Sequence, residues 1–154
     1  MPVLARKLPD QLLEEARACD ATLHAGDLVS LGVLDQLARM IPTYAVHGNQ
    51  DSPTVKARLP SQRTVTLAGW EIGIVHGHEG PGMYTEDRAF NTFASKKVDV
   101  IVFGHSHQPV NVKRDGILMF NPGSPVAGRG GQGNTYGFLE LEDSIGSKIV
   151  NLTR

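Results

Sequence analysis

The chain has 154 residues, a length typical of one compact domain, and we predict a single domain over residues 1–154. With a formal net charge of −1, nothing suggests a broad surface for nucleic acid or anionic membranes. The single cysteine, Cys19, excludes an internal disulfide and fits a cytoplasmic location without establishing it, and no apolar run approaches the ~18 residues of a membrane span.

The first half of the sequence alternates predicted strands with amphipathic helices. A helix is expected to open at Leu8–Asp10, because Pro9 is tolerated in a first turn, and a strand follows in ATLHAGD. Ser30 is a good N-cap for a second helix over LGVLDQLARM, which ends before Pro42. TYAVHGNQD then indicates a second strand and loop. Strand alternating with helix is typical of the α/β class.

The second half is expected to contain hairpins. RTVTLAGWEIGIVHGH indicates a hairpin that turns near Ala68–Gly69, and a helix around residues 86–96 follows. The continuous apolar run VDVIVFG indicates a buried strand. Two further hairpins are predicted in VNVKRDGILMFNPGS, which turns at Asp115–Gly116, and in YGFLELEDSIGSKIVNL.

Four polar motifs, HAGD, HGNQD, VHGH and FGHSH, each come directly after a predicted strand. Loops beyond the carboxyl ends of strands are where open sheets bind ligands. Imidazole, carboxylate and amide groups together suit Mn, Fe, Zn or Ni better than Ca or Mg. Taken singly, such residues are more often structural histidines or turn residues, so the ordered set is what favours a metal site. Its candidate ligands are Asp27, Asn49, His76, His105 and His107.

The order GD, GNxD, HGH, GHxH and then NPGS resembles the calcineurin-like metallophosphoesterases. More narrowly, it is similar to their small single-domain phosphodiesterase branch, which shares its fold with a retromer subunit. The resemblance runs over about residues 8–141. It implies a four-layer αββα sandwich with two divalent metal ions held between loops. It also implies a phosphoesterase that hydrolyses small phosphodiesters or activated phosphomonoesters through a metal-activated hydroxide, with manganese among the usable metals.

The resemblance also implies a role for each candidate ligand. Asp27 corresponds to the carboxylate that bridges the two ions. Asn49, His76 and His105 complete one site, and His107 belongs to the other. Asp27, Asn49 and His105 are the residues expected to be catalytic.

The family pattern opens with a strand that ends in Asp-x-His, whereas this sequence opens with MPVLARKLP. We therefore expect the first strand to be missing, the domain to be N-terminally incomplete, one ion to be held tightly, and activity to be impaired. A start downstream of the motif and a genuinely short protein both stay open. The alternative function is a non-catalytic scaffold that binds other proteins on the same fold, and homo-oligomerisation is also left open.

Several residues beside the motifs have a possible functional role and an ordinary structural alternative. His78 either orients a ligand or contacts substrate, or it faces solvent from a loop. Arg129, in the glycine-rich segment GRGGQGN, either clamps a substrate phosphate or is an ordinary surface arginine. Gln50 stands where many family members carry a histidine as a candidate general acid, and it cannot titrate. Protonation of the leaving group must then come from water or another residue, or the preferred substrate has a good leaving group. Asp51 is expected to brace the loop of Asn49.

Overall fold

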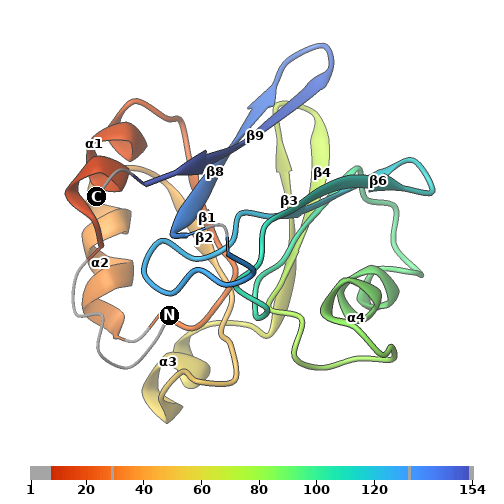
Figure 1. The fold of residues 1–154 in the computed structure, drawn as a ribbon, viewed down its shortest axis with the longest axis horizontal. Coiled ribbons are helices and arrows are strands. Elements are labelled where there is room, and N and C mark those ends of the chain that lie inside the picture. Colours follow the sequence, from red (N-terminus) through yellow and green to blue (C-terminus); the bar gives the residue numbers. More distant parts are fainter. Residues whose placement is uncertain (1–7, 29, 132, 153–154) are drawn as a thin grey trace.

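The computed structural model describes residues 8–28, 30–131 and 133–152. It has the expected four layers, with α1 and α2 on one side, α4 on the other and the strands between them (Figure 1). The helices and strands follow one another along the chain in this order: α1 (Asp10–Arg17), β1 (Thr22–His24), α2 (Leu31–Met40), β2 (Thr43–Ala45), α3 (Pro53–Arg58), β3 (Gln62–Leu67), β4 (Trp70–Val75), α4 (Thr85–Thr92), β5 (Val100–Val102), β6 (Val110–Arg114), β7 (Ile117–Asn121), β8 (Thr135–Leu141) and β9 (Ile145–Asn151).

The first two helices cover the short parallel pair formed by β1 and β2. Leu13 of α1 and Leu34 and Leu37 of α2 are buried in one cluster with Ala45 of β2. Leu34 and Leu37 are three residues apart, so they share one face of their helix. Ser30 stands at the predicted N-cap of α2, but its side chain makes no capping hydrogen bond.

A five-stranded sheet in the order β3-β4-β5-β7-β6 forms the next layer. Its two hairpins turn at the predicted Ala68–Gly69 and Asp115–Gly116 positions. Because β4, β5 and β7 run parallel, the loops after β4 and β5 leave the sheet at the same edge. On the outer face, Phe93 at the end of α4 packs with Ile101 and Met119.

The remaining layer of strands lies on the inner face of this sheet and is divided into two pieces. Leu23 of β1 and Leu139 of β8 both pack against a core that contains Ile72, Val100 and Phe120. Among the described residues, the β1–β2 pair and the β8–β9 hairpin are separate two-stranded sheets.

Two details of the predicted elements differ from the structure. The helix expected around residues 86–96 is α4, which ends earlier, at Thr92. The six-residue helix α3 is an addition, capped by the Ser52 hydroxyl, which accepts a hydrogen bond from the Val55 N–H at 3.3 Å. The segment MPVLARK and the expectation of a missing first strand lie outside the described residues. No helix in the described ranges is long and apolar enough to cross a membrane.

Candidate metal centre

The predicted ligands come from four loops that follow β1, β2, β4 and β5. Asp27 lies three residues after β1, and Asn49 four residues after β2. His76 comes directly after β4, and His105 follows β5. Since β1 pairs parallel with β2 and β4 pairs parallel with β5, each pair of loops leaves its sheet at one edge.

His76 is the centre of the cluster. Its Nε2 lies 3.0 Å from Asn49 Oδ1, 3.2 Å from Asp27 Oδ2 and 3.3 Å from His105 Nδ1. Its Nδ1 lies 2.7 Å from the carbonyl oxygen of Ala25, which can only accept, so Nδ1 carries a proton. In the neutral imidazole the lone pair of Nε2 then faces Asn49 Oδ1 and the Asp27 carboxylate, which can only accept, whereas His105 Nδ1 donates to Nε2 if it carries the His105 proton. A metal ion bound between these atoms would make the contacts of Nε2 with Asp27 and Asn49 favourable.

The donor set and its spacing fit a divalent transition metal. Ligands bound at ~2.1 Å with tetrahedral or octahedral angles lie ~3.0–3.4 Å apart, which matches the three separations measured from His76 Nε2. Counting only His, Cys, Asp and Glu, however, the described residues contain no group of three or more arranged around one point. The measured contacts all run through His76. The cluster is therefore held by contacts among the side chains themselves and is not a completed coordination shell. A bound ion would replace these contacts with bonds to the metal.

Asp27 is buried and stays ionised. Burial by itself would raise the pKa of its carboxyl, but the hydrogen bond and charge of His76 and the N–H of Gln50 outweigh it and lower the pKa to about 2. Burial lowers the pKa of His105 and of His107, so both imidazoles are neutral at neutral pH. An ionised carboxylate and neutral imidazoles are the forms that bind metals.

Asp51 holds two of the loops together. Its buried carboxylate accepts hydrogen bonds from the backbone N–H groups of Asp27 at 2.9 Å, Leu28 at 2.6 Å and Gly48 at 2.7 Å. The predicted bracing role of Asp51 is confirmed, and it extends across two strands. Gly48 is required beside it, because a Cβ at that position would overlap Asp27 Oδ1.

Three of the predicted ligands have left-handed backbone conformations, with φ of 56° at Asp27, 65° at His105 and 58° at His107. The other two described non-glycine residues with positive φ, Ala68 and Asp115, lie in hairpin turns. Each such residue costs on the order of 1 kcal/mol and persists only where the surroundings impose it. Strain concentrated on candidate ligands is typical of a functional site.

His107, in the loop between β5 and β6, lies beside Arg129, in the loop between β7 and β8. His107 Nδ1 donates to the carbonyl oxygen of Ala127 at 3.0 Å, which leaves the lone pair of Nε2 free for another partner. The Arg129 N–H donates to the carbonyl oxygen of His107 at 3.0 Å, and the arginine side chain is exposed. His107 also lines the same cavity as His76 and His105.

His78 lies close to the cluster. Its ring centre is 5.2 Å from that of His76 and 6.2 Å from that of His105. Its buried Nδ1 has no hydrogen-bond partner in the described structure, and its Nε2 lies 3.3 Å from a carboxylate oxygen of Glu79. The partly buried side chain of His78 therefore lies near the predicted ligands, at the start of a loop whose next residues, 79–84, are exposed.

Two supporting residues are absent from the predicted set. The buried Asn121 donates from Nδ2 to the Gly104 carbonyl oxygen at 3.0 Å and to Ser106 Oγ at 3.1 Å, and so holds the loop of His105. The NPGS motif was the signal in the sequence that could have identified Asn121. The second is the backbone carbonyl of Ala25, which sets the His76 tautomer and carries no side-chain signal in the sequence.

Comparison with known proteins gives one consistent family. The profile of the calcineurin-like phosphoesterase superfamily domain matches residues 4–144. A protein of Methanothermobacter thermautotrophicus named probable metallophosphoesterase is 30% identical over 129 residues, which are 84% of this chain and 74% of that protein. The phosphodiesterase YfcE of Escherichia coli K12 is 37% identical over 103 residues, 62% of this chain and 51% of its own length.

The solved structures agree on the fold. Wild-type Vps29 of Entamoeba histolytica, in complex with Zn²⁺, superposes with a TM-score of 0.75 over 97% of this chain and 93% of that chain. The two sequences are 18% identical, so this similarity concerns the fold alone.

Proposed function

This chain belongs to the calcineurin-like phosphoesterase superfamily, and we propose that it is a divalent-metal-dependent hydrolase of small phosphodiesters or activated phosphomonoesters. One observation carries the proposal: His76 Nε2, with its tautomer set by Ala25, faces Asp27, Asn49 and His105 at 3.0–3.3 Å. The names of the relatives support a phosphoesterase activity, and that of YfcE supports a phosphodiesterase.

The chain's own residues divide into those that hold an ion and those that position them. Asp27, Asn49, His76 and His105 would hold a transition metal such as Mn, Fe, Zn or Ni. A bound divalent ion supplies Lewis acidity, which lowers the pKa of water and offsets the charge of a phosphate group. Asp51 fixes two of the loops, so the ligands need little reorganisation when substrate binds.

Arg129 and His107 extend the cluster toward the glycine-rich loop. The exposed guanidinium of Arg129 is free to pair with phosphate oxygens, which it matches in geometry. We propose that Arg129 binds the substrate phosphate and that His107, whose carbonyl oxygen accepts from the Arg129 N–H, adds a ligand for a second ion. The His78 ring, whose centre lies 5.2 Å from that of His76, is proposed to hydrogen-bond the substrate from beside His76.

The leaving group determines which esters are good substrates. Gln50 follows Asn49 in the sequence and has no proton to donate as an acid at neutral pH. Burial lowers the pKa of His78, so it too is mainly unprotonated at neutral pH. Esters whose leaving groups need no protonation, such as aryl phosphodiesters, are therefore expected to react faster than alkyl esters.

The proposal is tested by the hydrolysis of bis-(p-nitrophenyl) phosphate with and without Mn²⁺. Asn49→Ala removes one ligand from an exposed position, so the protein should still fold. We expect kcat/KM with Mn²⁺ to fall at least about 100-fold, which corresponds to about 2.7 kcal/mol of lost transition-state stabilisation.

Asn111→Ala is the matched control, because Asn111 is exposed on β6 and its side chain makes one hydrogen bond, with Ser147. It should leave the rate unchanged. A wild-type protein that binds Mn²⁺ but hydrolyses neither aryl phosphodiesters nor aryl monoesters would contradict the proposal and favour the scaffold function.

A further inference from the structure

The turn that carries His76 and His78 lies against the start of α4. Gly77, between the two histidines, has a φ of 103°, and a Cβ on it would lie 2.7 Å from Thr85 Cγ2. Thr85 is the first residue of α4. The helix therefore contacts the backbone between a predicted metal ligand and the imidazole that is proposed to contact substrate.

Arg88, in the first turn of α4, joins this turn of the chain to the helix. Its Nε donates to the Gly77 carbonyl oxygen at 2.8 Å, its Nη1 to the Met83 carbonyl oxygen at 3.2 Å, and its Nη2 to Thr85 Oγ1 at 3.3 Å. All three nitrogen atoms of the guanidinium are used. Because the donors of a guanidinium lie in one rigid plane, Arg88 places its three acceptors relative to one another.

The Gly77 carbonyl belongs to the planar peptide unit that leads into His78, so holding it sets the direction in which the chain enters His78. The contacts of the ring itself are weak. Its Nε2 lies 3.3 Å from a carboxylate oxygen of Glu79, whose side chain is 76% exposed, and its buried Nδ1 has no hydrogen-bond partner in the described structure. The bond from Arg88 therefore restrains His78 through the backbone, where the ring's own polar contacts do not.

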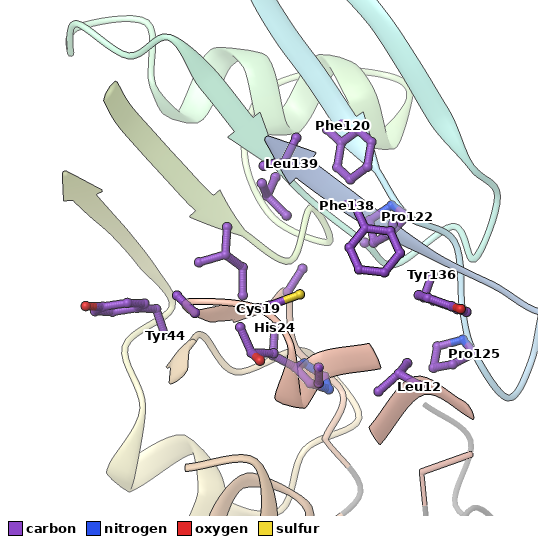
Figure 2. A pocket seen from close by; sticks show the side chains of 18 of the residues that line it. Leu12, Cys19, His24, Tyr44, Phe120, Pro122, Pro125, Tyr136, Phe138 and Leu139 are labelled. Carbon is purple, nitrogen blue, oxygen red and sulfur yellow. The ribbon is translucent and has the colours of Figure 1, made fainter. Parts of the chain in front are cut away.

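The space beside His78 would let the ring move if the turn were not held. The ring lines a cavity of about 170 Å³ together with Gly77 and Thr92. A larger cavity, of about 690 Å³, is lined by His76, but neither His78 nor a residue of α4 is among the described residues that line it. Figure 2 shows side chains around this larger cavity from α1, β1 and β8, including Leu12, His24 and Phe138. The position of His78 thus depends on its turn and on α4, and not on the walls of the larger cavity.

α4 is fixed to the sheet without the help of Arg88. Asp87 pairs with Arg114 of β6 at 2.9 Å, and the Arg114 guanidinium lies 4.2 Å from the centre of the Phe90 ring. Phe93, which follows the helix, is buried in the core on the outer face of the sheet. Replacing Arg88 should therefore loosen the turn and leave the helix in place.

The positive charge of Arg88 is not used in an ion pair. Its neighbour Asp87 pairs with Arg114, and among the described residues no carboxylate forms an ion pair with Arg88. Burial is the largest cause that lowers the pKa of His105, and the charge of Arg88 is one of the smaller causes, so the guanidinium lies within electrostatic range of the cluster. A cation at this edge of the site also favours the approach of an anionic ester.

We propose that Arg88 is a positioning residue, which holds the Gly77 carbonyl so that the His78 ring faces the substrate. It acts through the backbone and touches no reacting atom. The inference rests on the proposed function, because it takes from it that His78 hydrogen-bonds the phosphate ester.

The test measures the hydrolysis of bis-(p-nitrophenyl) phosphate at saturating Mn²⁺ by Arg88→Met, which keeps a side chain of similar bulk and removes its donors. KM should rise at least about fivefold with little change in kcat, because a hydrogen bond to the bound substrate is lost. A merely structural role would lower kcat in proportion to the folded fraction, which circular dichroism measures, and would leave KM unchanged.

Two further variants complete the comparison. Arg88→Lys keeps the charge without the planar fork, so its KM should rise in the same direction, and it provides the test if Arg88→Met does not fold. Arg39→Met, at an exposed position in the last turn of α2, is the matched control and should leave KM unchanged.

A double-mutant cycle shows whether Arg88 acts through His78. His78→Ala alone should raise KM, and Arg88→Met added to it should change KM by less than about twofold, since the ring that Arg88 positions is already absent. Effects that multiply in the double variant, or a KM of Arg88→Met equal to that of the wild type, would overturn the proposal.

The NMR signals of the histidine rings give a readout that needs no activity. In the free protein, Arg88→Met should shift the Hε1 signal of His78 and leave that of His24 in place. A wild type that hydrolyses no aryl phosphodiester would contradict the proposed function alone. Unchanged His78 signals in Arg88→Met would contradict the role given to Arg88, whatever the activity of the wild type.

Discussion

At the scale of single residues, Asp51 determines where the candidate ligands lie. Its carboxylate contacts no other side chain in the described hydrogen-bond set, yet it accepts three backbone N–H groups from two loops. Hydrogen bonds from buried donors to a charged acceptor contribute about 1.5–3 kcal/mol each. Asp51 therefore stabilises the fold and places Asp27 next to His76 at the same time.

Asp51→Asn is expected to lower the free energy of unfolding by about 3 kcal/mol or more, because the amide turns an NH₂ group toward donors and leaves at least one of them unpaired. Urea unfolding followed by circular dichroism measures the change. Asp143→Asn, at an exposed position between β8 and β9, is the matched control and should change stability by less than about 0.5 kcal/mol. Equal stability of the two variants would show that the three hydrogen bonds are unimportant.

The scale of elements shows why the loops after β1 and β2 approach so closely. These strands have only three residues each. The loops that follow them touch where Gly48 lies against Asp27. At Gly48 a Cβ would overlap Asp27 Oδ1 and lie 2.7 Å from the Asp27 backbone nitrogen. The strand pair can present Asp27 to His76 only while this position has no side chain.

Gly48→Ala should therefore displace Asp27 and lower the affinity for Mn²⁺ by about 10- to 100-fold. Isothermal titration calorimetry with Mn²⁺ measures the affinity. Gly32→Ala is the control, because Gly32 is exposed in α2 and its new Cβ would meet only Ser30 Oγ at 3.5 Å. Unchanged affinity in the Gly48 variant would mean that Asp27 does not hold the ion.

His24, at the end of β1, makes the free energy of unfolding depend on pH. Burial lowers the pKa of His24 to about 3, and its Nδ1 accepts a hydrogen bond from the Gly26 N–H at 3.2 Å. The unfolded chain binds the proton near pH 6.5 and the folded chain only near pH 3, so stability falls as the pH drops through this window. The slope from this group is at most about 1.4 kcal/mol per pH unit.

His24→Asn keeps an acceptor for Gly26 and removes the titrating group. Urea unfolding between pH 7 and pH 4 should show a shallower loss of stability in this variant than in the wild type. His78, His105 and His107 also have lowered pKa values, so part of the slope should remain. Identical slopes for the two proteins would refute the role given to His24.

At the scale of the whole molecule, the sequence predicts the layers and the convergence of the motifs, because both follow from local patterns. Apolar runs, turn residues and polar strand ends indicate the hairpins and bring Asp27, Asn49, His76 and His105 to one region. Local patterns do not indicate which strands pair across the chain, so the order β3-β4-β5-β7-β6 of the large sheet was not predicted. The backbone strain at Asp27 and the contact with the Ala25 carbonyl also depend on packing between distant segments.

The central claim is that a divalent ion replaces the hydrogen bonds around His76. The most direct measurement is anomalous diffraction at the manganese edge from crystals of the protein grown or soaked with MnCl₂. The account predicts one strong peak at about 2.0–2.3 Å from Asp27 Oδ2, Asn49 Oδ1, His76 Nε2 and His105 Nδ1. An ordered site with no peak at millimolar Mn²⁺, and with His76 Nε2 still 3.0 Å from Asn49 Oδ1, would contradict it.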